Sequence, residues 1–160
     1  MEIKLVEIEK TEDLNLVLGQ SHFIKTVEDI SEALVTAVPK IKFGLAFCES
    51  SGPRLIRHYG TDGELEKLAI RNAEKIGAGH SFIVLLRNVY PINILQKIKN
   101  VEEVVSIFAA TSNPIKIIVL EDGEQKGIIG VLDGLTPIGV ESQKDINERK
   151  KFLRDIGYKF

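Results

Sequence analysis

Apolar and polar residues recur with two different periods along the chain, and the periods predict strands and helices in turn. Residues 2–9 alternate apolar with charged positions, which predicts a half-buried or edge strand. Short, mostly apolar runs predict buried strands at residues 14–19, 41–48 and 82–86. Apolar residues spaced three and four apart predict amphipathic helices, at residues 27–38, from 61–63 to 76, 92–98, 101–108 and 142–156.

Turn residues divide these segments and predict two hairpins. Residues 54–59 follow the break at residues 49–53 and read as a strand that returns beside the preceding one. Residues 115–120 and 127–132 flank Glu121-Asp122-Gly123-Glu124, which is a hairpin signature. Helices alternate with strands in the first two thirds of the chain. The order predicts one α/β domain over residues 1–160, with a mixed β-sheet flanked by helices and a C-terminal β-hairpin and helix.

Composition narrows the class of protein. Hydrophobic residues make up 44% and charged residues 28%, which is typical of a globular chain. A formal charge of −2 gives no bulk attraction to nucleic acid or to anionic membranes. No signal-peptide pattern or membrane-length apolar run is present, and a single cysteine, Cys48, excludes a disulfide framework within the chain. We expect a cytoplasmic protein. The lack of tryptophan, with many Glu, Lys and Ile residues, points to a thermophile.

Polar, chemistry-bearing residues gather where predicted strands end. Four such segments are Gln20-Ser21-His22, Glu49-Ser50-Ser51-Gly52, Arg87-Asn88 with Tyr90, and Thr111-Ser112-Asn113. If the strands at residues 14–19, 41–48 and 82–86 run parallel, the first three segments meet at one edge of the sheet. That edge would then combine an imidazole, a carboxylate, a guanidinium, amides and hydroxyls. Such a mixture suits a small polar ligand that carries a ring and hydroxyl groups.

His22 is the natural centre of such a site. An imidazole can act as a general base, as a phosphoryl acceptor or as a neutral hydrogen-bond partner. Lys25, or the N-terminus of the helix from Val27, can steady an anion beside it. His80 is the rival candidate, although it lies at the opposite end of its strand from Arg87. A structural histidine is the alternative for either residue, and the three histidines lack a His-x-x-x-His spacing, so no metal site is expected.

Other motifs exclude several enzyme classes. Residues 77–82 lack the third glycine of a dinucleotide fingerprint and precede a strand, and neither a Walker-type phosphate loop nor a Gly-x-Ser-x-Gly elbow is present. Ser50-Ser51-Gly52 can cradle a phosphate with backbone amides or form a plain turn. Arg87 ends a buried strand, so we expect an anionic partner for it, either Glu49 or Asp133.

Five long segments together resemble one known family. They are LGQSHFIKTVEDISEALVTAVP (18–39), KFGLAFCESSGPRLIRHYG (42–60), IGAGHSFIVLLRNVYPINILQKIKNVEEV (76–104), ATSNPIKIIV (110–119) and GIIGVLDGLTPIGVE (127–141). The chain resembles the adenosine-specific kinase family of archaea and thermophilic bacteria. The resemblance implies a cytoplasmic α/β protein that binds adenosine and AMP and transfers a phosphoryl group, with a phosphohistidine as one route. His22 and His80 both lie in segments that carry the resemblance.

A nucleoside site can be assembled from the same residues. Phe23 or Tyr90 can stack on adenine, an amide of Gln20, Asn88 or Asn113 can read its edge, and Glu49 suits the ribose hydroxyls. The candidate ligand-binding residues are Gln20, Ser21, Phe23, Lys25, Glu49, Ser51, Arg87, Asn88, Tyr90 and Asn113, with His22 and His80 as candidate catalytic residues. ATP with magnesium is an open donor, for which Glu49 and Asp133 are the nearest metal ligands.

Three functions stay open at this point. The first is phosphoryl transfer to adenosine, and the second is a non-catalytic adenosine or AMP sensor. The third is a structural, oligomerising domain. A homo-oligomer is expected under each of them, because the chain has much apolar strand surface for its size.

Overall fold

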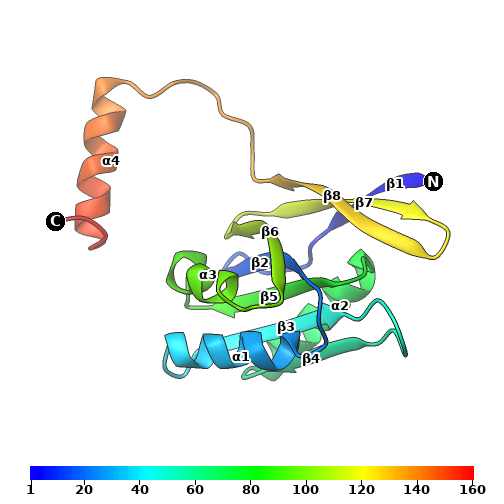
Figure 1. Cartoon of the computed structure of the whole chain (residues 1–160). Coiled ribbons are helices and arrows are strands. Elements are labelled where there is room, and N and C mark those ends of the chain that lie inside the picture. Colours follow the sequence, from blue (N-terminus) through cyan, green and yellow to red (C-terminus); the bar gives the residue numbers. More distant parts are fainter.

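Strands and helices succeed one another along the computed structural model, which describes residues 1–160 (Figure 1). The strands are β1 (Glu2–Glu7), β2 (Leu14–Ser21), β3 (Lys42–Cys48), β4 (Ile56–Gly60), β5 (Ser81–Arg87), β6 (Val104–Thr111), β7 (Ile115–Asp122) and β8 (Gln125–Asp133). The helices are α1 (Thr26–Ala37), α2 (Gly63–Ile76), α3 (Pro91–Lys99) and α4 (Gln143–Asp155). The predicted α/β class is confirmed. None of the four helices has both the length and the hydropathy to cross a bilayer.

The strands form two sheets, and neighbouring strands in both are antiparallel. A five-stranded sheet has the order β4-β3-β5-β2-β6, and a three-stranded sheet has the order β1-β7-β8. This pairing corrects the single mixed sheet that the sequence predicted. β2 and β3 do point the same way, but β5 lies between them and runs opposite to both. The direction of β5 decides which polar loops share an edge.

Helices or strands cover both faces of the five-stranded sheet. α1 and α3 pack on one face, where Ile30 and Ile94 join a cluster of buried side chains. α2 and the three-stranded sheet pack on the other face, where Leu65 and Ile117 join a second cluster. Because both faces are buried, the central strands read as continuous apolar runs rather than as alternating ones.

One predicted helix is a strand. Residues 101–108 were expected to be helical, whereas the structure has β6 from Val104 to Thr111, paired with β2. The segment contains Val104, Val105 and Ile107, and β-branched residues pack well in sheets. The apolar spacing fits a helix and a strand alike over so short a run, and the free edge of β2 decides between them.

Most predicted turns and helix ends are found where expected. Gly77 ends α2 with φ 60° in the left-handed region, and Pro91 occupies the first turn of α3. The start of α1 has no side-chain cap. Lys25 is the N-cap residue, and its ammonium binds Asp29 at 2.8 Å.

The C-terminal helix stands apart from both sheets. Figure 1 shows α4 at the end of an extended segment that leaves β8. None of its residues is buried, although Ser142 and Asp145 form a complete capping box at its start. The helix is therefore well formed locally but has no packing partner within the chain.

Candidate functional site

Two strand ends and one strand start meet at one edge of the five-stranded sheet. Because β5 runs opposite to its neighbours, its first residue lies beside the last residues of β2 and β3. The His80 N–H donates to the Cys48 carbonyl at 2.7 Å, and the Ser21 N–H donates to the His80 carbonyl at 2.9 Å. His22 and Glu49 follow directly along the chain. We call this edge, formed by residues 20–23, 47–51 and 79–81, the histidine edge.

His80 is fixed in a backbone conformation that side chains rarely adopt. Its φ of 64° lies in the left-handed region, which is uncommon for residues other than glycine. Its ring stacks on Phe47, with centroids 6.0 Å apart and planes at 10°. Beside it, a Cβ atom on Gly79 would lie 2.8 Å from the Cβ of Ser50, so the turn is tight. Strained residues held by their surroundings cluster at functional sites.

His22 and Phe23 are exposed on a loop whose backbone is held by hydrogen bonds. The His22 N–H donates to the Glu103 carbonyl at 3.0 Å. The buried Ser21 hydroxyl donates to the same carbonyl at 3.0 Å and lies 2.6 Å from the hydroxyl of Thr26. The loop backbone is thus fixed while the two rings, 6.4 Å apart, stay accessible.

Glu49 supplies a fixed negative charge at the histidine edge. The Leu55 N–H donates to its carboxylate at 3.0 Å, and Arg57 donates to both carboxylate oxygens at 3.2 and 3.3 Å. The Leu55 N–H, followed by the Arg57 guanidinium, lowers the pKa of this carboxyl. Glu49 is therefore an ionised hydrogen-bond acceptor at neutral pH.

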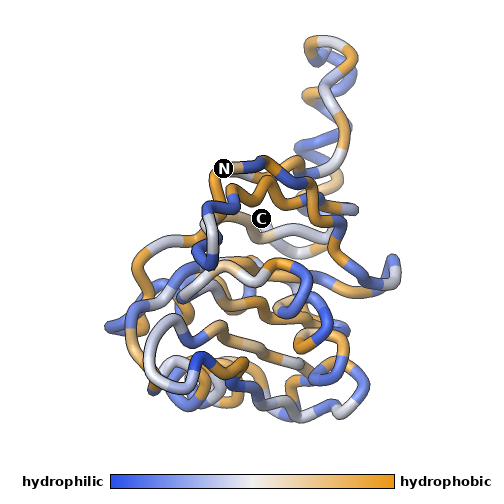
Figure 2. Tube along the Cα trace, turned by 90° about the vertical axis from the view of Figure 1, so that its right-hand side faces the viewer, coloured by the Kyte–Doolittle hydropathy of each residue, from blue (hydrophilic) through white to orange (hydrophobic).

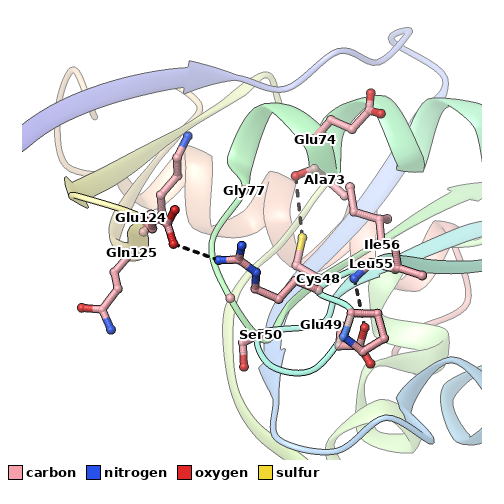
Figure 3. A pocket seen from close by; sticks show the side chains of 14 residues that line it. Cys48, Glu49, Ser50, Leu55, Ile56, Ala73, Glu74, Gly77, Glu124 and Gln125 are labelled. Carbon is pink, nitrogen blue, oxygen red and sulfur yellow. Dashed lines mark hydrogen bonds and ion pairs between the residues drawn. The ribbon is translucent and has the colours of Figure 1, made fainter.

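Two cavities flank these strand ends. The larger, about 820 Å³, lies between the β3–β4 loop, the C-terminal end of α2 and the β7–β8 hairpin, and Glu49 and Gly79 contribute to its wall (Figure 3). The smaller, about 450 Å³, lies between the start of α1 and β4, with Ile24 and Arg57 in its wall. Both volumes fall within the range of small-molecule sites, roughly 300–1,000 Å³.

Cationic side chains around the histidine edge are each bound to carboxylates. Arg57 pairs with Glu49, and Arg54 binds Glu124 at 3.2 Å across the mouth of the larger cavity. Lys25 lies 2.8 Å from Asp29, with the carboxylates of Glu102 and Glu103 at 3.5 and 3.8 Å. An anionic ligand at this edge would compete with these carboxylates.

Glu103 is a feature that sequence reasoning missed. Only 2% of the residue is exposed, and neither carboxylate oxygen has a hydrogen-bond partner. Burial, and secondarily the neighbouring Asp29, raises the pKa of its carboxyl. No sequence signal singled it out, because it lies in the stretch expected to be an amphipathic helix, between the apolar positions of that helix.

The remaining residues expected at this edge take backbone or loop positions. Gln20 pairs through its backbone with Ser81 of β5 and Ser106 of β6. Ser51 is exposed in the β3–β4 loop, where its carbonyl accepts the Arg54 N–H at 3.3 Å.

The structure places Arg87, Asn88 and Tyr90 at the opposite end of the sheet. Arg87 pairs with Leu14 of β2 and Lys42 of β3, at the starts of those strands. The expectation that this segment meets His22 and Glu49 is therefore wrong, because β5 is antiparallel to both neighbours. His80, expected at the far end, takes the place assigned to Arg87.

Arg87 has anionic partners, as expected for a guanidinium at the end of a buried strand, but they are not the residues that the sequence predicted. Its guanidinium lies 3.7 Å from Asp13, 3.6 Å from Asp62 and 3.3 Å from Glu64. Glu49 lies at the other end of the sheet and Asp133 is not among the partners. The cluster joins α2 to the central strands, which is a structural role.

Asn113 also lies away from the histidine edge. Its side-chain amide donates to Asp133 at 3.2 Å, and the Thr111 hydroxyl donates to the same carboxylate at 2.7 Å. Thr111 pairs with Leu16, near the start of β2. These bonds tie the end of β6 to the end of β8.

Comparison with a protein-family model identifies the family of this chain. The model of the family described as adenosine-specific kinase matches residues 6–159. The chain belongs to this family. A crystal structure of the PH1918 protein from Pyrococcus horikoshii OT3 is similar, with 46% identity and a TM-score of 0.95 over 99% of this chain and 98% of that one. No match is found among curated proteins.

An adenosine-related, kinase-like function follows from membership of the adenosine-specific kinase family. The chain has no cluster of three or more His, Cys, Asp or Glu side chains arranged to hold a metal ion. At the histidine edge the one candidate metal ligand from the sequence, Glu49, already binds Leu55 and Arg57. These residues do not fit a protein-held magnesium site, so no step is assigned to one.

Proposed function

We propose that the protein binds adenosine and AMP at the histidine edge and transfers a phosphoryl group to adenosine through His22. The observation that supports this is the meeting of His22, Glu49 and His80 from three distant segments beside a cavity of nucleoside size. Family membership supports the choice of adenosine.

The nucleoside is assigned to the α1 side of the sheet. Phe47 belongs to the cluster packed against α1, so the His80 ring stacked on it lies on that side. The 450 Å³ cavity lies there as well, and Ile24 in its wall follows His22 and Phe23. Phe23, half exposed, is the candidate to stack on adenine, and Glu49 is the candidate acceptor for ribose hydroxyls.

The chemistry has two displacement steps. A ring nitrogen of His22 attacks the γ-phosphorus of ATP, the bond to the bridging oxygen breaks, and ADP leaves. The adenosine 5′-hydroxyl then attacks the same phosphorus, the P–N bond breaks, and AMP forms. The hydroxyl proton passes to solvent or to a neighbouring base. His80 is the candidate group to hydrogen-bond the phosphoryl oxygens.

Radiolabel transfer tests this proposal. Protein incubated with γ-labelled ATP should acquire an acid-labile, base-stable label, and adenosine should discharge it into AMP. We expect His22→Ala to lose both label and AMP formation, by about 100-fold or more. His80→Ala should keep the label but discharge it slowly.

His58 provides a control for the labelling step. It lies outside the histidine edge, with its ring bound to Glu66 at 2.7 Å, but it lines the 450 Å³ cavity from β4. His58→Ala should therefore acquire the label like the wild type, and any loss of AMP formation should come from weaker adenosine binding. AMP formation unchanged in both His22→Ala and His80→Ala would remove histidine from the mechanism.

A non-catalytic adenosine or AMP sensor is the second candidate function. Lys25, Arg54 and Arg57 are paired with carboxylates, which favours this function. Positive charges that stabilise a phosphoryl group during transfer would instead be free to contact the phosphate oxygens. Calorimetric binding of adenosine and AMP, without turnover in the presence of any nucleoside triphosphate, would favour the sensor over the kinase.

A further inference from the structure

The C-terminal segment carries large apolar side chains that nothing in the chain covers. We call residues 134–160 the arm. Leu135, Ile138 and Val140 are 97–105% exposed in its extended part, and Phe152 is 60% exposed in α4. Figure 2 shows the arm rising clear of the body with hydrophobic residues along it. A helix of 13 residues without tertiary contacts is marginal in water, so α4 needs a surface to pack on.

The outer face of the three-stranded sheet is the matching surface. Ile117 and Val119 of β7 point into the core, so the alternate residues Ile118 and Leu120 face outward. They pair with Leu5 and Ile3 of β1, which are 60% and 63% exposed. No helix of the chain covers this face, which we call the outer face. Its members are Ile3, Leu5, Ile118, Leu120 and Leu132.

The arm projects in the same way in a crystallised relative. The similarity to the Pyrococcus horikoshii structure extends over 99% of this chain with a TM-score of 0.95. The arm has 27 of the 160 residues, and a chain in which those residues lay elsewhere would not reach that score. The similarity therefore includes the arm, and two sequences that are 46% identical share its projecting position.

Size and charge favour a second copy of the chain as the partner on which the arm packs. A standard interface uses about 20–30 residues a side, which the arm alone supplies. The arm has six Lys and Arg against four Asp and Glu, a net charge of +2, whereas residues 1–133 carry −4. The three-stranded sheet itself contains five acidic and three basic residues. Every copy thus carries a basic, apolar arm and an acidic sheet with an apolar outer face.

We propose that the arm of one copy packs its apolar side chains on the outer face of a second copy. Arm and outer face are different surfaces of the same chain. The contacts close into an oligomer when each copy gives and receives one arm, either as a two-fold dimer of two copies or as a ring of more. Packing of the arm on the outer face buries the exposed apolar side chains of both surfaces.

Single substitutions with a matched charge change test the contact in the full chain. We expect the wild type to exceed the 17.8 kDa monomer in light scattering at micromolar concentration. Leu153→Asp on α4 and Leu5→Asp on the outer face should each weaken association by at least 100-fold. Asn147→Asp, on an exposed polar position of α4, should leave the mass unchanged. Far-UV circular dichroism checks that each variant is folded.

Val105→Asp separates the outer face from the other apolar surface. Val105 is 61% exposed in a groove of about 510 Å³ between β6 and α3. If this variant dissociates and Leu5→Asp does not, the assignment of the acceptor surface is overturned.

Mixing the two defective variants gives the sharpest outcome. Leu153→Asp keeps an intact outer face, and Leu5→Asp keeps an intact arm. A mixed pair therefore regains one intact contact, so the mixture should associate more strongly than either variant alone but more weakly than the wild type. A monomeric wild type, or a mixture that associates no more strongly than the single variants, would overturn arm exchange.

Discussion

Burial of the Glu103 carboxyl group beside the histidine edge costs free energy. Its backbone carbonyl anchors both Ser21 and His22, while its carboxylate is buried without a hydrogen-bond partner. A buried carboxylate without hydrogen bonds is expensive, typically about 1–3 kcal/mol or more, and Lys25, 3.8 Å away, offsets only part of this cost. Burial therefore raises the pKa of this carboxyl, since the neutral form costs less to bury.

The raised pKa predicts a pH-dependent stability. Glu103 binds its proton more tightly in the folded than in the unfolded chain, so its contribution is fully present below the unfolded-state pKa, about 4.3, and is lost as pH rises through the higher folded-state value. Glu103→Gln removes this loss. We expect the variant to be more stable than the wild type at pH 8, by about 1–3 kcal/mol, and to lose this advantage at pH 4.

Urea denaturation at pH 4 and pH 8 measures this difference. Glu102→Gln is the control, because the Glu102 side chain is 89% exposed and its substitution should change stability by less than about 0.5 kcal/mol at either pH. An identical effect of Glu103→Gln at both pH values would contradict a raised pKa.

At the scale of elements, the packing of α2 on β3 depends on one missing side chain. A Cβ atom on Gly44 would collide with the backbone of Leu65 and Glu66 at the start of α2. Gly44 therefore lets the helix axis come close to the sheet, and the same approach brings Asp62 and Glu64 to Arg87. The position of α2 on β3 is therefore set by tertiary contacts between residues that are distant in the sequence.

Gly44→Ala should consequently lower the free energy of unfolding by about 3 kcal/mol, because a backbone collision moves a whole helix. Gly127→Ala on β8 is the matched control. A Cβ there meets no atom within 4 Å, so the change should be close to neutral. Chemical denaturation of both variants, compared with the wild type, measures the contrast. Equal effects would show that α2 can shift without cost.

For the molecule as a whole, ligand binding must appear as stability. A ligand that binds only the folded state adds about 2.7 kcal/mol at a hundred times its Kd. For a chain of 150–250 residues each kcal/mol corresponds to roughly 2–4 °C in Tm. Adenosine and AMP should therefore raise the Tm by several degrees, with guanosine as the control. No shift with any adenine compound would favour the purely structural, oligomerising function.

Local chemistry made much of the fold predictable. Gly77 and Pro91 mark helix ends because of their backbone limits, and Asp122-Gly123 marks the β7–β8 hairpin because Gly123 adopts a positive φ at no steric cost. These effects act within a few residues, so the sequence alone determined most element types, the α/β class and the segments that carry the family resemblance.

Only the tertiary structure decided the direction of β5, the strand identity of β6 and the exposed position of the arm. A strand buried on both faces carries no sign of which neighbour it pairs with or in which direction, because those choices depend on contacts between residues far apart in sequence. For that reason the sequence predicted Arg87 beside His22, whereas the antiparallel β5 brings His80 there instead.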